Sequence, residues 1–255
     1  MARHLWLAKV ARDAGLNITE VAGWERRGPE TMNPSPKVVI CHHTATSARA
    51  AGDYPSLSVV RDGRPGLSGP LSHYGIGRNG TVYVIASGKA NHAGVGTWGG
   101  TTRSIDCIGI EAESPGDGTW TAAQLDTYDR LAAAILAHLK LDVSALCAHR
   151  EWARPPGRKP DPTGIDMVKM RARVAQLLRP MVRVQAEDED VRDEDIARIA
   201  DEVWGRVQTR NDGIVDYPNV PGNVLFATLR AIHVLTARVQ ALEARISPPE
   251  DRKTA

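Results

Sequence analysis

Three of the eight histidines in this 255-residue chain, His42, His92 and His149, stand at the ends of segments with the composition of β-strands. Imidazole and carboxylate groups are the usual ligands of a hydrolytic zinc site, which holds three protein ligands and keeps a fourth position for water. A histidine at a strand end can also be a hydrogen-bonded core residue. No single one of these histidines therefore decides between a metal site and ordinary packing.

Five short motifs, taken together, favour the metal site because they follow one another in one order. They read Ile-Cys-His-His-Thr-Ala-Thr at 40–46, Asn-His-Ala-Gly at 91–94, Ile-Gly-Ile-Glu at 108–111, Ala-His-Arg-Glu-Trp at 148–152 and Arg-Lys-Pro-Asp-Pro at 158–162. With these motifs, residues 36–180 resemble the zinc-dependent N-acetylmuramoyl-L-alanine amidases and the related peptidoglycan recognition proteins. The segment 53–94 is most similar to endolysins of phages that infect actinobacteria.

The resemblance implies which residues hold the metal. The family's ligands for Zn²⁺ fall on His42, His149 and Asp161, the last a carboxylate where many members carry cysteine. Two neutral imidazoles and one carboxylate leave the ion with a net positive charge, so it can acidify a water and polarise the scissile carbonyl.

The resemblance also implies catalytic and substrate-binding residues. Glu111, in a Gly-Ile-Glu context found in the recycling-type amidases, is the predicted general base. Lys159, two residues before the third ligand, is predicted to stabilise the oxyanion. The predicted substrate contacts are Asn91, His92 and Arg103. The tyrosine that contributes in some members is replaced here by Ser72.

These residues would be positioned by an α/β fold in which helices flank a central mixed β-sheet. Strands are predicted at 38–43, 107–113 and 145–149, with a hairpin around Asn79-Gly80. Thr121 followed by Gln124 has the capping-box pattern and predicts a helix over 121–140. The remaining predicted elements are helices at 5–14 and 165–178 and a strand at 18–21.

The chain divides into three predicted parts. They are an N-terminal helix/strand extension at 1–35, a zinc amidase catalytic domain at 36–180, and an acidic linker with a helical C-terminal region at 181–255. An acidic run at 187–195 and apolar residues at helical spacing over 225–246 indicate a small α-helical region. That region could bind the wall, mediate self-association or fold as a helical hairpin.

Composition excludes several other classes of protein. No apolar run approaches the roughly 20 residues that span a bilayer, so we expect no stable membrane association. The charged first thirty residues do not form a signal peptide, which predicts a location in the host cytoplasm until release to the cell wall. A single phenylalanine and no stripe of basic and aromatic residues argue against nucleic acid. Cys41, Cys107 and Cys147 are expected to be buried free thiols.

The expected function follows from the resemblance. It is that of a peptidoglycan hydrolase, an endolysin that uses zinc-activated water to cleave the amide between N-acetylmuramic acid and L-alanine of the stem peptide. Bacterial peptidoglycan is then the partner. Two alternatives stay open. One is a non-catalytic peptidoglycan-binding recognition module, which typically lacks a metal ligand. The other is an intracellular muropeptide-recycling amidase, which needs no additional C-terminal region.

Overall fold

A computed structural model describes residues 2–178 of the chain. All of them belong to one compact unit that spans Met1–Val182. The predicted C-terminal region at 181–255, with its expected roles in wall binding or self-association, lies outside the described residues. Among the described helices, none is long and apolar enough to cross a membrane.

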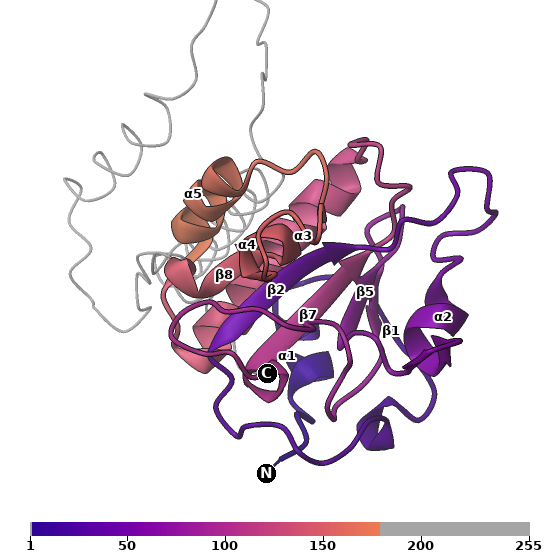
Figure 1. Ribbon diagram of the computed structural model, residues 1–255. Helices are drawn as coiled ribbons and strands as arrows, with labels where there is room; N and C mark the ends of the chain where they lie inside the picture. The colour runs from indigo at the N-terminus through magenta and orange to yellow at the C-terminus, as the bar shows by residue number, and fades with distance from the viewer. Residues whose placement is uncertain (1, 179–255) are drawn as a thin grey trace, which may run out of the picture. The chain divides into compact units, whose positions relative to one another are not determined.

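The centre of this unit is a six-stranded mixed sheet (Figure 1). In spatial order its strands are β1 (Ile18–Glu20), β6 (Val82–Val84), β5 (Tyr74–Ile76), β7 (Cys107–Ala112), β2 (Val38–His43) and β8 (Leu146–Ala148). Neighbouring strands are parallel except β5 and β6, which form the antiparallel hairpin predicted around Asn79-Gly80. The predicted α/β fold with a mixed sheet is confirmed.

Helices flank the sheet, as expected. They are α1 (Leu7–Asp13), α2 (Leu57–Asp62), α3 (Ala122–Leu139), α4 (His149–Trp152), α5 (Met167–Leu178) and three 3₁₀ turns, η1 (Trp24–Arg26), η2 (Ser104–Asp106) and η3 (Val143–Ala145). Helix α3 begins with the predicted capping box, in which the Thr121 side chain accepts from the Gln124 N–H and the Gln124 side chain accepts from the Thr121 N–H. Figure 1 shows α3 and α5 side by side, in agreement with their packing contacts.

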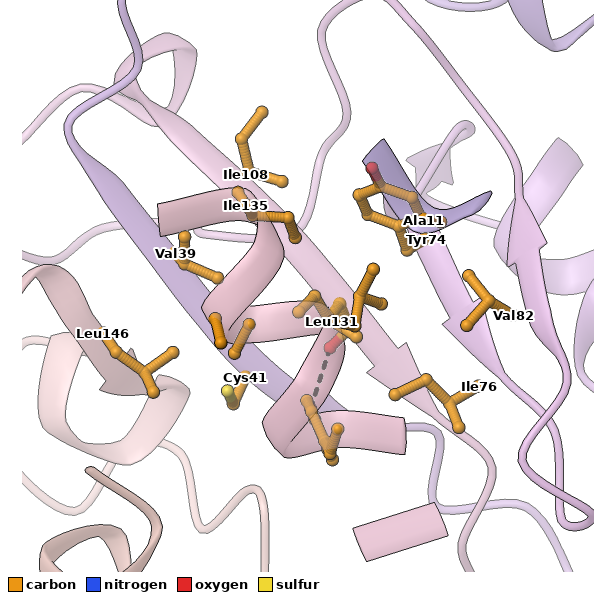
Figure 2. Packing of buried hydrophobic residues seen from close by; sticks show 14 of the residues in the cluster. Ala11, Val39, Cys41, Tyr74, Ile76, Val82, Ile108, Leu131, Ile135 and Leu146 are labelled. Atoms are coloured by element: carbon orange, nitrogen blue, oxygen red, sulfur yellow. Dashed lines mark hydrogen bonds between the residues drawn. The ribbon is translucent and has the colours of Figure 1, made fainter. Parts of the chain in front are cut away.

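One face of the sheet is closed by α1, α3 and α5. Alternate residues of the strands, such as Val39, Ile108 and Tyr74, point to this face and pack with Leu131 and Ile135 of α3 (Figure 2). Burying this contiguous apolar surface is the main stabilising contribution of the unit. The strands that carry the predicted site residues therefore rest on a rigid, water-free layer.

The other face carries the polar residues of the predicted site. Val38 and Ile40 of β2 form a small cluster there with Cys107, Cys147 and Trp152. His42 and Glu111 follow on the same face, because they continue the same alternation and are directly paired in the β2–β7 register. All three cysteines are free and buried, as expected.

Two features of the fold were not predicted. The Gly/Pro/Ser-rich stretch before Pro70 contains α2 and a two-stranded ribbon, β3 (Gly63–Arg64) with β4 (Leu67–Ser68). The N-terminal segment is also joined to the main sheet, since β1 pairs with β6 and the Tyr74 hydroxyl donates to the Leu7 carbonyl of α1 at 2.8 Å.

Candidate metal centre

The candidate site lies at the carboxyl ends of parallel strands, where loops can bring side chains from several strands together. His42 is the fifth residue of β2, and His149 is the first residue of α4, directly after β8. Asp161 comes from the loop between α4 and α5. All three side chains are buried.

Three ligand atoms converge at this point. The Nδ1 atoms of His42 and His149 are 3.0 Å apart. Asp161 Oδ2 lies 3.1 Å from the Nδ1 of His42 and 2.9 Å from the Nδ1 of His149. Within residues 2–178, these atoms form the one group of His, Cys, Asp and Glu ligands that lie close enough together to hold a metal ion.

The contact that His149 makes through Nε2 determines which form of its other ring nitrogen, Nδ1, faces His42 and Asp161. Its Nε2 lies 3.1 Å from the Ala93 carbonyl, which can only accept a hydrogen bond. The proton of a neutral His149 is therefore on Nε2, and Nδ1 presents a lone pair to the two other ligands. This arrangement, with one ring nitrogen on a carbonyl and the other free, is typical of metal-bound histidine.

The loop that carries Asp161 is held by backbone contacts. The Arg150 N–H donates to the Asp161 carbonyl at 2.9 Å, and the Arg150 guanidinium donates to the carbonyls of Pro162 and Ile165. The Thr163 N–H donates to Nδ1 of His43 at 3.1 Å. The carboxylate is thus held in place independently of its contacts with the two histidines.

The charge state of the site fits a cation. Burial lowers the pKa of His42 to about 4, with His149 adding to the effect, so the imidazole is neutral at pH 7. Burial alone would raise the pKa of the Asp161 carboxyl, but its close contacts with the His149 and His42 rings hold that pKa well below its usual range. One buried carboxylate and two imidazole nitrogens within 3.1 Å of one another are stabilised by a positive charge among them.

The donor set also fits zinc by type and spacing. Ligand bonds of about 2.0–2.2 Å at tetrahedral angles place neighbouring ligand atoms about 3.3 Å apart. The three separations of 2.9–3.1 Å are close to that value. Two imidazoles and one carboxylate match the three-ligand set of hydrolytic zinc sites.

Glu111 lies beside this group on β7. It pairs with His42 in the strand register, and its side chain is only partly buried. Burial raises the pKa of the Glu111 carboxyl well above its ordinary value, and the Asp161 charge raises it further, whereas Lys159 opposes the shift. Lys159 also lowers the pKa of His42, so its ammonium acts on both Glu111 and His42.

The predicted substrate contacts are placed differently from one another. Asn91 is exposed and its amide donates to the Ser68 carbonyl at 2.9 Å. Arg103 precedes η2 at the amino end of β7, the sheet edge opposite the metal group, so the structure does not bring it to the site. His92 is buried, with its Nδ1 3.0 Å from Nε2 of His42, and so lies behind a ligand rather than on an open wall.

Two tyrosines that support the site were missed by the sequence reasoning. The Tyr128 hydroxyl of α3 accepts from the His42 N–H at 2.8 Å and reaches the carbonyls of His42 and Ile110 at 2.7 and 3.0 Å. The Tyr54 hydroxyl donates to the Glu111 carbonyl at 2.9 Å, and its ring lies over Gly75, where a Cβ would come within 2.4 Å of it. The helical spacing of Tyr128 gave only a packing signal, and Tyr54 had no signal.

Glu113, the residue that follows β7, has a structural role. Its carboxylate accepts from the hydroxyls of Thr44 and Ser56 and from the Ser56 N–H, at 3.1–3.2 Å. It is fully buried and joins the end of β7 to two loops. Of the two carboxylates at 111 and 113, Glu111 is the one that pairs with His42 in the strand register and is partly open to solvent.

Comparison with known proteins gives a family match. The sequence profile of the family described as N-acetylmuramoyl-L-alanine amidase matches residues 32–164, which is more than half of the chain. No curated protein sequence matches the chain significantly.

Solved structures of several such proteins are similar to this chain. The E. coli amidase AmiD, in complex with an anhydro-N-acetylmuramic acid tripeptide, is 26% identical over 58% of this chain and 61% of its own, with a TM-score of 0.45. The endolysin LysCS from Clostridium intestinale is 19% identical over 62% and 95%, with a TM-score of 0.44. Drosophila PGRP-LB is 17% identical over 60% and 92%, with a TM-score of 0.45.

Proposed function

This chain belongs to the N-acetylmuramoyl-L-alanine amidase family, and on that premise we propose that it is a zinc-dependent hydrolase of bacterial peptidoglycan. The bond it cleaves is the amide between the lactyl group of N-acetylmuramic acid and L-alanine of the stem peptide. The convergence of His42, His149 and Asp161 beside Glu111 is the observation that supports this proposal most strongly.

His42, His149 and Asp161 would hold the ion through the three atoms that face one another. A zinc ion bound there supplies a Lewis acid for the scissile carbonyl and makes water a stronger nucleophile near neutral pH. The protein contributes a fixed, buried frame, since the backbone at both histidines and at Asp161 is anchored by hydrogen bonds. Such preorganisation reduces the rearrangement needed when substrate binds.

Glu111 is the proposed general base. Its carboxylate removes the proton of the attacking water and then delivers a proton to the leaving amine of L-alanine. Its raised pKa, caused mainly by burial, suits both steps because a group that titrates closer to the working pH can accept and release protons. The Tyr54 hydrogen bond to the Glu111 carbonyl fixes the backbone from which the carboxylate extends.

Lys159 is proposed to stabilise the negative charge that develops on the carbonyl oxygen. No hydrogen-bond or ion-pair partner for its ammonium is found among residues 2–178, and the side chain is partly exposed. The effect of its charge on the pKa values of both Glu111 and His42 supports a position of the ammonium close to these two residues. A cation there also increases the local concentration of anionic stem peptides.

The test uses purified peptidoglycan and follows two products, free amino termini and sugar reducing ends. The native protein should release L-alanyl amino termini without reducing ends, lose this activity with a chelator and regain it with zinc. Glu111→Gln, which removes the carboxylate but keeps the size of the side chain, should bind zinc normally and release few amino termini. Release of reducing ends would instead identify a glycosidase, and a fully active Glu111→Gln variant would remove Glu111 from the mechanism.

A recognition module without activity is the second candidate, and the ligand set distinguishes it. Such modules typically lack a metal ligand, whereas His42, His149 and Asp161 are all present and close together here. Wall binding without release of amino termini under any zinc concentration would nevertheless favour the module.

The proposed biological role is that of an endolysin rather than of a recycling amidase. The similarity of residues 53–94 to phage endolysins and the additional chain at 181–255 support it. Truncation after Arg179 should then leave the cleavage of soluble muropeptide nearly unchanged and weaken the lysis of whole walls. An equal loss in both assays would contradict this division of roles.

A further inference from the structure

His92 occupies a position that the proposed mechanism does not explain. Its side chain is 7% exposed, so it offers little surface to a substrate. Its ring stands edge-on to His42 at 5.1 Å and to His73 at 5.3 Å between centroids. Its two nitrogens contact Nε2 of His42 at 3.0 Å and the Cys107 carbonyl at 3.4 Å.

The Cys107 carbonyl determines which ring nitrogen carries the proton in His92 and, through His92, in His42. A carbonyl oxygen accepts only, so Nε2 of His92 carries the hydrogen. A neutral imidazole has one N–H, which leaves Nδ1 of His92 as an acceptor. The His42 Nε2 must then be the donor across the 3.0 Å contact, and the His42 Nδ1 presents its lone pair to His149 and Asp161.

We propose that His92 is a positioning residue of the metal centre, which selects the Nε2–H tautomer of His42 and thereby directs the His42 Nδ1 lone pair at the ion. This inference rests on the proposed zinc centre and adds a residue to it. His149 obtains the same tautomer more directly, from the Ala93 carbonyl. Both histidine ligands are thus prepared to bind through Nδ1 before an ion arrives.

The surroundings of His92 hold the ring in this orientation. Gly109 of β7 lies against it, and a Cβ at that position would come within 2.7 Å of the Cγ and Nδ1 of His92. On its other side, the His73 ring is fixed because its Nδ1 accepts from the Gly109 N–H at 3.0 Å. The missing side chain at Gly109 therefore provides the space in which His92 can reach His42.

The decisive comparison is between two nearly isosteric substitutions, His92→Asn and His92→Leu. Asparagine places an amide oxygen close to the former Nδ1 and can still accept from His42, whereas leucine cannot. Zinc affinity, measured by competition with a chromogenic chelator, should fall roughly 10- to 100-fold in His92→Leu and stay close to the wild-type value in His92→Asn. His138→Leu, which removes an exposed histidine on α3, is the matched control and should bind zinc as the wild type does.

Two further measurements keep the proposal testable if His92→Leu does not fold. Gly109→Ala should displace the His92 ring and weaken zinc binding while His92 itself is unchanged. In the zinc-loaded wild-type protein, nitrogen NMR of the histidine rings should show His42 and His92 as Nε2–H tautomers. A His92 ring protonated on Nδ1, or equal zinc affinities for the leucine and asparagine variants, would overturn the proposal.

The outcomes also separate this inference from the proposed function. A wild-type protein that binds no zinc would remove the metal centre itself. A wild-type protein that binds zinc tightly, together with a folded His92→Leu variant of the same affinity, would remove only the role of His92.

Discussion

Replacing Tyr128 by phenylalanine tests how the fold holds the strand that carries His42. The Tyr128 side chain is fully buried, and its hydroxyl accepts from the His42 N–H and donates to the carbonyls beside it on β2 and β7. The Tyr128→Phe change keeps the ring and removes only this hydroxyl. The buried His42 N–H then loses the partner that the hydroxyl provides.

The expected loss can be worked out by comparison with a second tyrosine. The hydroxyl makes three close contacts with the strand backbone, and a typical hydrogen bond contributes about 0.5–1.5 kcal/mol, so Tyr128→Phe should destabilise the unit by about 2–3 kcal/mol. Tyr74 is equally buried, but its hydroxyl only donates, to the Leu7 carbonyl in the first turn of α1. That carbonyl keeps its helical partner, so Tyr74→Phe should cost only about 1 kcal/mol.

The assay is thermal unfolding of both variants in the presence of a chelator, which removes any stabilisation by bound zinc. For a unit of this size, 1 kcal/mol shifts Tm by roughly 2–4 °C. Tyr128→Phe should therefore lower Tm by roughly 4–12 °C and Tyr74→Phe by roughly 2–4 °C. Equal shifts, or a larger shift for Tyr74→Phe, would refute the reasoning that the Tyr128 hydroxyl stabilises β2 and β7 more than the Tyr74 hydroxyl stabilises α1.

Three further predictions concern charged residues of the site. If Glu111 is the base, it works only when ionised, and activity should fall as the pH drops through its raised pKa. Because Lys159 lowers that pKa, Lys159→Met should move the acid limb of the kcat/KM profile to higher pH. An unmoved limb would contradict the coupling between Lys159 and Glu111. Asp161→Asn should weaken zinc binding in chelator competition, whereas Asp161→Cys, which restores an anionic ligand, should retain it. Glu113→Gln places an amide donor against the N–H and hydroxyl donors of Ser56, so it should lower the unfolding free energy measured in urea by about 1–3 kcal/mol. Zinc affinity should stay unchanged, in contrast to a substitution at His42, His149 or Asp161.

The set His42, His149 and Asp161 was predicted from the family resemblance, and the placement of its two histidines also follows from the local sequence pattern. His42 lies in an apolar, β-branched segment, and His149 follows another. The carboxyl ends of parallel strands meet at one edge of a sheet, so the pairing of β2 with β8 brings the residues at their ends close together. The capping box at Thr121 and Gln124 predicted the start of α3 for a similarly local reason.

The roles of His92 and Tyr54 could not be anticipated, because both depend on space left by a glycine on a neighbouring strand. Gly109 allows the His92 ring to lie beneath His42, and Gly75 allows the Tyr54 ring to lie beside Glu111. A sequence records the missing side chain but not which distant residue fills the space. His92 was predicted to be a substrate contact, and its burial against His42 was not anticipated.

The position of Arg103 shows a different limit. Its place in the sequence, a few residues before β7, is close to Glu111 along the chain. An extended strand of six residues separates the two ends by roughly 17 Å or more, however, and the metal group lies at the far end. Nearness in sequence to a catalytic residue therefore does not indicate nearness to the site when a strand lies between.

The most direct test of the proposed activity is hydrolysis of a defined muropeptide, N-acetylmuramic acid linked to a short stem peptide, in water enriched with heavy oxygen. Mass spectrometry of the products then locates the bond that water has cleaved. The zinc-loaded protein should place the label in the lactyl carboxylate of the sugar and release an unlabelled peptide that begins with L-alanine. Label at the sugar anomeric carbon or within a peptide carboxylate would contradict amidase chemistry at this centre.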